Sequence, residues 1–322
     1  MASSITTDPE EGFGRPPKRT RPRTKDRPDY SAAPEGAVMT IDRGRYTCLL
    51  DGRPVVAVKA RNLGQKVIVG DRVKLVGDVS GQEGTLARIV EVEARQTVLR
   101  RTADDDDPHE RPIVANADQL AIVTALADPP PRPGMIDRVL VAAYDAGIAP
   151  ILILTKADLA DAGWLLDIYA PLGLPVIAVE PEADLGQARA LLDGHRTVLV
   201  GHSGVGKSTL VNALIPGANR TVGDVSGIGK GRHTSTSAEA LALPGGGYVI
   251  DTPGVRSFGL SHVTMESMLA AFPDLNAIAA DCPRGCTHAA GAVDCALDAA
   301  VADGKLHPER LESFRRMSGA WQ

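Results

Sequence analysis

Residues 201–209 read Gly-His-Ser-Gly-Val-Gly-Lys-Ser-Thr and match the phosphate-loop pattern G-x-x-x-x-G-K-[ST]. The apolar residues 197–200 before them are typical of a strand, and Leu210, Val211 and Leu214 after them have helical spacing. A strand, a glycine turn and a helix in this order direct backbone N–H groups and the positive end of the helix dipole at one anion. The stretch therefore predicts an α/β fold that carries a phosphate site.

This loop and one later motif have the chemistry of a magnesium–triphosphate site. Lys207 supplies a positive charge for the outer phosphates, which makes it a candidate catalytic residue, and Ser208 offers a hydroxyl to Mg²⁺. Residues 251–254, Asp-Thr-Pro-Gly, follow a short apolar strand. At the end of that strand Asp251 can hold Mg²⁺ through water, and Gly254 can donate its N–H group to a γ-phosphate.

A second motif, Thr-Lys-Ala-Asp at residues 155–158, points to guanine. It resembles the [NT]-K-x-D motif of GTPases, in which Asp158 would accept hydrogen bonds from the ring N–H and the amine of guanine. Adenine lacks these donors, so an unpaired carboxylate would reject ATP. Thr155 stands where most GTPases carry Asn, which predicts a weaker tether of this loop. The alternative interpretation is a helix start, with Asp158 as a charge in its first turn.

The order of these motifs is unusual. The base motif precedes the phosphate loop and Asp-Thr-Pro-Gly follows it, whereas ordinary GTPases carry the phosphate loop first. Cutting and rejoining a chain at surface loops keeps its sheet and its site. The order therefore indicates a circularly permuted GTPase.

The region before these motifs predicts a tail and a small β domain. Residues 1–35 are rich in Pro, Thr and Ser and contain a basic run at 15–27 that is interrupted only by Asp26, so we expect a disordered basic tail. The run could touch phosphate backbones, and the alternative is a tail that is merely solvated. Within residues 36–101, short β segments separated by glycine turns favour a small β-barrel without choosing its type. These segments are 37–42, 45–50, 55–60, 71–76 and 85–92.

From residue 112, after a charged linker at 102–112, apolar strands alternate with helices. This alternation predicts a parallel sheet covered on both faces, in a GTPase domain over residues 112–262. The expected strands are 120–124, 151–154, 176–179, 197–200, 238–243 and 248–250, and the expected helices are 135–145, 159–170 and 185–192. Residues 263–322 are Ala-rich and predict a helical domain.

The helical domain contains a cysteine and histidine cluster with the spacing C-x3-C-x-H-x6-C. Three thiolates and one imidazole would fill the tetrahedral shell of Zn²⁺ and leave no open position, so we expect a structural zinc site. Its ligands would be Cys282, Cys286, His288 and Cys295. The alternative is a set of buried free thiols. The remaining cysteine, Cys48, lies in a predicted barrel strand and is interpreted as a small buried hydrophobe.

Composition limits the class of protein. The formal net charge of −5 excludes a globally basic nucleic-acid binder, although it allows a local basic surface. No apolar run reaches the roughly 18 residues of a membrane span, and the N-terminus lacks the apolar core of a secretory signal. Four cysteines in 322 residues do not make a disulfide scaffold. We therefore expect a cytoplasmic monomer that does not contact a membrane.

The motifs together resemble the ribosome small subunit-dependent GTPase A family. The resemblance rests on residues 155–158, 201–209, 231–236 (Gly-Arg-His-Thr-Ser-Thr) and 251–256, and it covers roughly residues 37 to 318. It implies an OB-fold barrel, hydrolysis of GTP stimulated by the small ribosomal subunit during late maturation, and contact with 16S ribosomal RNA. RNA contacts would come from the tail, the barrel and the arginines Arg310, Arg315 and Arg316. The residues assigned to GTP are Thr155, Lys156, Ala157, Asp158, Gly201, His202, Ser203, Gly204, Val205, Gly206, Lys207, Ser208, Thr209 and Gly254.

The glycine- and serine-rich residues 223–237 are typical of a switch loop that orders over the γ-phosphate. Thr234 or Ser235 would complete a Mg²⁺ shell that also includes Ser208 and Asp251. Val255 stands where many GTPases carry a water-orienting Gln, so His233 or a partner must position the attacking water. The alternative for His233 is a solvent-facing loop histidine.

Two other functions are compatible with parts of the sequence. An ATP-using phosphotransferase would share the phosphate loop, but residues 155–158 argue against it. A non-catalytic RNA-binding scaffold with a vestigial nucleotide site would not need an intact Lys207, Ser208 and Asp251.

Overall fold

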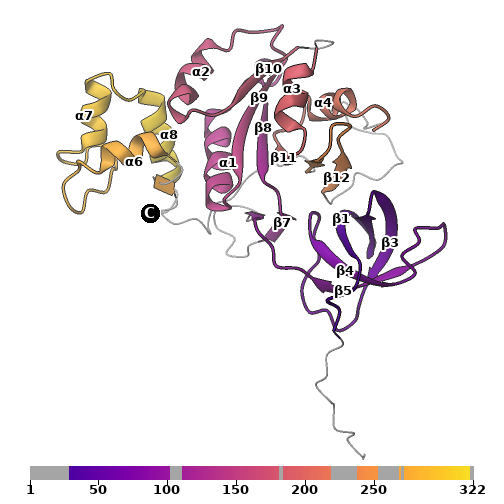
Figure 1. Ribbon diagram of the computed structural model, residues 1–322. Helices are drawn as coiled ribbons and strands as arrows, with labels where there is room; N and C mark the ends of the chain where they lie inside the picture. The colour runs from indigo at the N-terminus through magenta and orange to yellow at the C-terminus, as the bar shows by residue number, and fades with distance from the viewer. Residues whose placement is uncertain are drawn as a thin grey trace, which may run out of the picture.

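The computed structural model describes residues 29–101, 111–180, 184–218, 238–252, 268–269 and 272–319. It has an N-terminal β-barrel, a central α/β part and a C-terminal helical region, with the α/β part between the other two (Figure 1). Within the described residues, no helix combines the length and the apolar character that crossing a bilayer requires. The proposed division at residues 1–35, 36–101, 112–262 and 263–322 stays a prediction, and the tail to residue 28 lies outside the described residues.

Five strands form the barrel, close to where alternation predicted them. They are β1 (Glu35–Asp42), β2 (Arg45–Leu50), β3 (Arg53–Lys59), β4 (Arg72–Gly77) and β5 (Ala87–Val92). The order β1-β2-β3-β5-β4 closes because β4 also pairs with β1, and only the β3–β5 pair is parallel. Cys48 is fully buried in the core beside Leu75 and Ile89, and burial raises its thiol pKa to about 12. The barrel and the hydrophobic role of Cys48 are thus confirmed.

The expected charged linker is partly a hairpin. β6 (Val98–Arg101) pairs in antiparallel fashion with β7 (Arg111–Ala115), so residues 111 and 112 belong to a strand. Residues 102–110 lie outside the described part of the chain. The prediction missed this hairpin because each strand is short and its pairing crosses a charged segment.

The α/β part is a sheet with helices on both faces, as the alternation predicted. In sequence it contains β8 (Gln119–Ala125), α1 (Pro133–Asp145), β9 (Ala149–Thr155), α2 (Gly163–Tyr169), η1 (Ala170–Leu172), β10 (Val176–Val179), α3 (Gly186–Leu192), β11 (Arg196–Val200), α4 (Lys207–Leu214), β12 (Glu239–Ala242) and β13 (Tyr248–Asp251). The strand order is β10-β9-β8-β11-β13-β12, parallel except for β12. The base-motif strand β9 and the phosphate-loop strand β11 thus flank β8.

Helix α2 begins later than expected, at Gly163 instead of residue 159. The Asp161 carboxylate accepts a hydrogen bond from the Gly163 N–H at 2.8 Å, and the Leu159 N–H bonds back to the Lys156 carbonyl. These local bonds favour a turn over a helix at residues 156–162.

The barrel continues the edge of the α/β sheet. Strand β1 pairs with β12 in antiparallel fashion, with Thr40 opposite Glu239, so that one sheet of 11 strands runs through both parts. On its other side Glu239 lies opposite Asp251 of β13.

The C-terminal region contains α6 (Pro273–Ala279), α7 (Ala296–Ala302) and α8 (Pro308–Gly319). Its apolar core includes Phe272 and Phe314, whose rings meet edge to face with centroids 5.7 Å apart. These residues share one core with α1 of the α/β part. The C-terminal region therefore packs directly against the α/β part.

Candidate functional site

The phosphate loop links β11 to α4 in a conformation that its glycines make possible. A Cβ atom on Gly201 would lie 2.2 Å from the Val123 carbonyl oxygen of β8. Gly204 and Gly206 have φ angles of +82° and +88°, which side chains rarely adopt. The loop therefore packs against the neighbouring strand only with glycine at these positions.

Lys207 places its charge inside this loop. The side chain is 8% exposed, and its ammonium donates to the carbonyl oxygens of Gly201 and His202, the second at 2.7 Å. Burial lowers the pKa of Lys207, and the negative charge of Asp251 opposes that shift. A buried cation that is held by the loop itself is well placed to meet a phosphate.

The base motif touches the phosphate loop directly. Thr155, the last residue of β9, donates its hydroxyl to the Val205 carbonyl oxygen at 2.6 Å. Lys156, with a left-handed φ of +55°, donates from its ammonium to the Asp128 carbonyl oxygen. Thr155 thus supplies a tether where most GTPases carry Asn, and the two motifs meet at one edge of the sheet. Ala157 and Asp158 follow in the same turn, with Asp158 exposed.

The Asp-Thr-Pro-Gly motif begins at the same edge. Asp251 ends β13 opposite Leu199 of β11, and the Thr252 hydroxyl donates to the Leu199 carbonyl oxygen at 2.8 Å. Ser208 lies in the first turn of α4. The structure thus places Asp251 on the strand next to the one that leads into Lys207 and Ser208, where its charge acts on Lys207. Four of the sequence-predicted site residues lie outside the described part of the chain: His233, Thr234, Ser235 and Gly254.

The loop between β8 and α1 is a part of the site that the sequence prediction missed. Asp128 accepts the hydrogen bond from Lys156, while Arg132 lines a small cavity together with His202 and Val205. Burial lowers the pKa of His202, and the positive charges of Arg132 and Lys207 lower it further. The only signal in the sequence was the run Asp-Pro-Pro-Pro at 128–131, placed at the carboxyl end of a buried strand.

The comparison with known families agrees with this geometry. The family described as RsgA GTPase matches residues 92–261, which include the base motif, the phosphate loop and Asp251. The chain belongs to the RsgA GTPase family.

Relatives in this family share much of the sequence. A protein of Pseudomonas aeruginosa (strain LESB58) named "Small ribosomal subunit biogenesis GTPase RsgA" is 45% identical over 217 residues, which cover 64% of this chain and 63% of that protein. A protein of the same name from Azotobacter vinelandii is 40% identical over 261 residues, which cover 78% of this chain and 74% of that one. The match thus spans less than two thirds of the length of the Pseudomonas protein.

Two solved structures share the fold. YjeQ from Thermotoga maritima has 26% sequence identity and a TM-score of 0.70, covering 89% of this chain and 97% of that chain. YloQ, described as a circularly permuted GTPase, has 24% identity and a TM-score of 0.66, covering 89% and 94%. With β8, β9 and β10 before the phosphate loop, the predicted permuted architecture is confirmed.

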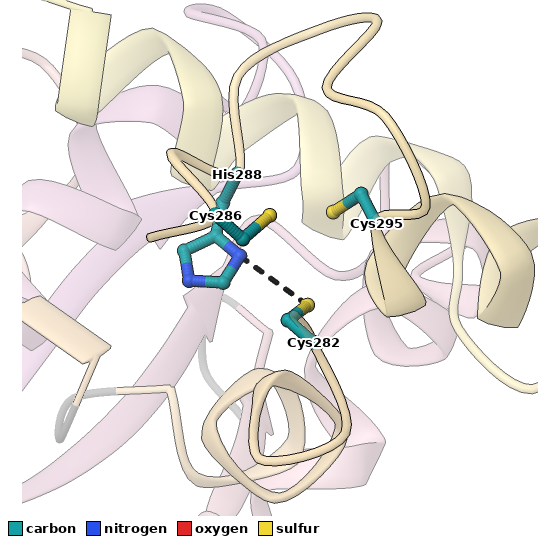
Figure 2. A group of neighbouring side chains, drawn as sticks. All are labelled: Cys282, Cys286, His288 and Cys295. Atoms are coloured by element: carbon teal, nitrogen blue, oxygen red, sulfur yellow. Dashed lines mark hydrogen bonds between the residues drawn. The ribbon is translucent and has the colours of Figure 1, made fainter. Parts of the chain in front are cut away.

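The cysteine and histidine cluster forms a compact group in this RsgA-family chain (Figure 2). The ligand atoms of Cys282, Cys286, His288 and Cys295 all lie within 4.8 Å of one another, and Cys282 Sγ is 3.6 Å from His288 Nδ1. Ligand atoms on a tetrahedral zinc ion lie about 3.5–3.8 Å apart, given bonds of about 2.0–2.3 Å. The group therefore fits a metal such as zinc with small adjustments.

Neighbouring groups hold the cluster in place. Burial raises the pKa of Cys282, and the hydrogen bond that the Ala296 N–H donates to its sulfur at 3.3 Å acts in the opposite direction. His288 has a left-handed φ of +56°, and its carbonyl oxygen accepts a hydrogen bond from Arg315 Nε at 2.9 Å. The loop that carries the imidazole is thus fixed from helix α8.

The arginines of α8 do not form the exposed basic surface that was expected. Arg310 is fully buried in ion pairs, so the prediction that it contacts RNA is wrong. Arg315 bonds Asp298 at 2.8 Å besides the His288 carbonyl, which directs it inward. Arg316 remains on the surface, 3.1 Å from Glu312.

The Thr155 tether leads to a first testable prediction. Thr155→Val keeps the shape but removes the hydroxyl, so the buried Val205 carbonyl loses its donor. We expect the free energy of GTP binding to become less favourable by about 1 kcal/mol. This change corresponds to a dissociation constant that is roughly fivefold higher. Titration with a fluorescent GTP analogue measures this dissociation constant. Thr155→Ser is the matched control and should bind nearly as the wild type does, whereas equal affinity for the Val variant contradicts the role.

Proposed function

We propose that this protein is a Mg²⁺-dependent hydrolase that converts GTP and water to GDP and phosphate. The observation that carries the proposal is the hydrogen bond between Thr155 and Val205, which holds the base motif against the phosphate loop. One GTP molecule would then meet Asp158 with its base and Lys207 with its outer phosphates. Residues 201–209 would wrap the phosphates with backbone N–H groups, and Gly254 would add another.

Magnesium would be held by Ser208, by Asp251 through water, and by Thr234 or Ser235 from the switch loop. When bound, the ion neutralises charge on the phosphate oxygens. Lys207 shares this task with its buried ammonium. Asp158 selects guanine over adenine, because a carboxylate finds two donors on guanine alone.

The cellular role that we propose is late maturation of the small ribosomal subunit, with hydrolysis stimulated by that subunit. Relatives that are 40–45% identical carry the name small ribosomal subunit biogenesis GTPase. The barrel, of the type that binds oligonucleotides, supports contact with 16S ribosomal RNA. We expect a cytoplasmic monomer.

The deciding experiment compares GTP turnover by the purified protein alone, with isolated small subunits, and with large subunits as the control. Strong stimulation by small subunits only is the expected result, and ATP should not be hydrolysed. GTP turnover that small subunits do not stimulate would support the GTPase activity and contradict the proposed ribosomal role. Turnover of ATP at the same rate would contradict the guanine assignment.

We assign the positioning of the attacking water to His233, because Val255 cannot orient water. His233→Ala should lower the subunit-stimulated, single-turnover rate roughly 100-fold and leave GTP affinity unchanged. His195→Ala is a suitable control, since His195 lies immediately before β11, at the opposite end of that strand from the phosphate loop. An unchanged stimulated rate would mean that the ribosome positions the water.

The Cys282, Cys286, His288 and Cys295 group would hold one structural Zn²⁺. Cys286→Ser should lose bound zinc, measured by mass spectrometry of metal content, and lower the unfolding temperature of the C-terminal region. Cys48→Ala is the matched control, because Cys48 lies in the barrel core, and should keep one zinc ion per chain. Full zinc content in the Ser variant would contradict the ligand assignment.

A further inference from the structure

A buried ionic group joins the C-terminal region to the α/β part. Arg310 of α8 is fully buried. Its Nη1 atom lies 3.3 Å from Asp137 Oδ1 of α1, and its Nε and Nη2 atoms lie 3.2 and 3.4 Å from the carboxylate of Asp274 in α6. The guanidinium also stacks on the Phe272 ring, with Cζ 4.0 Å from the centroid. One arginine therefore connects three helices from two parts of the chain.

Asp137 depends on this arginine. The carboxylate is fully buried, and its Oδ2 atom has no hydrogen-bond partner among the described residues. The Tyr169 hydroxyl lies 3.1 Å from Oδ1 and 3.2 Å from the Pro133 carbonyl oxygen. Burial raises the pKa of Asp137 to about 7, against the opposing charge of Arg310. Removal of Arg310 would raise this pKa further and would break the ion pair that joins α1 to α8.

The first turn of α1 leads directly into the candidate nucleotide site. Pro133 begins α1, and the residues before it form the loop that holds the base motif. In that loop Asp128 accepts the hydrogen bond from Lys156, and Arg132 lines a cavity with His202 of the phosphate loop. A displacement of α1 would therefore reach both halves of the site.

We propose that Arg310 is a positioning residue for the guanine nucleotide: by holding Asp137, it fixes the α1 loop that seats Lys156 and flanks the phosphate loop. This role rests on the proposed GTPase function. It makes nucleotide affinity depend on how the C-terminal region is docked. Because coupling is reciprocal, any partner that pulls α8 away from α1 weakens guanine nucleotide binding, and bound nucleotide strengthens the docking by the same factor.

Arg310→Met tests the role because it keeps the length of the side chain and removes its charge. We expect the dissociation constants for fluorescent GTP and GDP analogues to rise at least tenfold, with zinc content unchanged and with KM rising more than kcat falls. Lys305→Met, at the surface of the same region and paired only with Asp303 among the described residues, should match the wild type. Arg310→Lys should restore part of the affinity.

Tyr169→Phe is the milder second variant in case Arg310→Met does not fold. It removes only the hydroxyl beside Asp137 and should raise both dissociation constants about threefold. If the wild type binds GTP and Arg310→Met binds within twofold of it, the positioning role is overturned while the proposed function stands. If the wild type itself fails to bind guanine nucleotides, the proposed function fails first.

Discussion

Lys207→Ala is expected to lower the rate of GTP hydrolysis roughly 1,000-fold, since it removes the one buried cation of the phosphate loop. GTP affinity should fall more than GDP affinity, because the lysine reaches the outer phosphates. Measuring phosphate release under single-turnover conditions, with and without small subunits, separates chemistry from binding.

Lys305→Ala is a matched control for this variant, because Lys305 lies on the surface of the C-terminal region and pairs only with Asp303 among the described residues. It should hydrolyse GTP as the wild type does. Folding of the Lys207→Ala variant is checked by its unfolding temperature, because the substitution also leaves the carbonyl oxygens of Gly201 and His202 without their donor. A hydrolysis rate within threefold of the wild-type rate would show that Lys207 is not a catalytic residue for GTP hydrolysis.

Asp158→Asn is expected to change the base preference from guanine to xanthine. A carboxylate accepts from the ring N–H and the amine of guanine, whereas the amide of Asn can donate to the oxo group that xanthine carries in place of that amine. The ratio of GTP affinity to xanthosine triphosphate affinity should fall roughly 1,000-fold. Competition titrations with the two triphosphates measure the ratio.

The neighbouring Asp161→Asn is the control for charge alone. Asp161 lies in the same turn, and its carboxylate accepts a hydrogen bond from the N–H of Gly163, the first residue of α2. Its substitution should leave base preference unchanged. An Asp158→Asn variant that keeps its full preference for GTP would contradict the assignment of Asp158 to the guanine base.

Local patterns predicted most of the fold. Short alternating segments predicted the five barrel strands, and apolar runs predicted β8, β9 and β11. These predictions were possible because the pattern that marks a strand lies in residues that are close together in the sequence. The motif order predicted the permutation, which the strand order then confirmed. The metal cluster was also predictable, since its four ligands lie within 14 residues.

Contacts between distant residues were not predictable in this way. The partners of Arg310 lie 36 and 173 positions away in the sequence, so nothing near it indicated burial instead of an RNA contact. The Thr155 bond to Val205 spans 50 positions, and the Asp128 contact with Lys156 spans 28. The packing of strands β8, β9 and β11 brings Thr155 and Lys156 to their partners, and the packing of helices α1, α6 and α8 brings Arg310 to its partners.

The pairing of β1 with β12 has a consequence for solubility. An outermost strand offers unpaired N–H and C=O groups to other chains, and it is a common route to aggregation. Here the barrel covers β12, so the backbone that follows the switch loop cannot recruit a foreign strand at that side. The N-terminal barrel thus shields the sheet of the catalytic part, besides any contact it makes with nucleic acid.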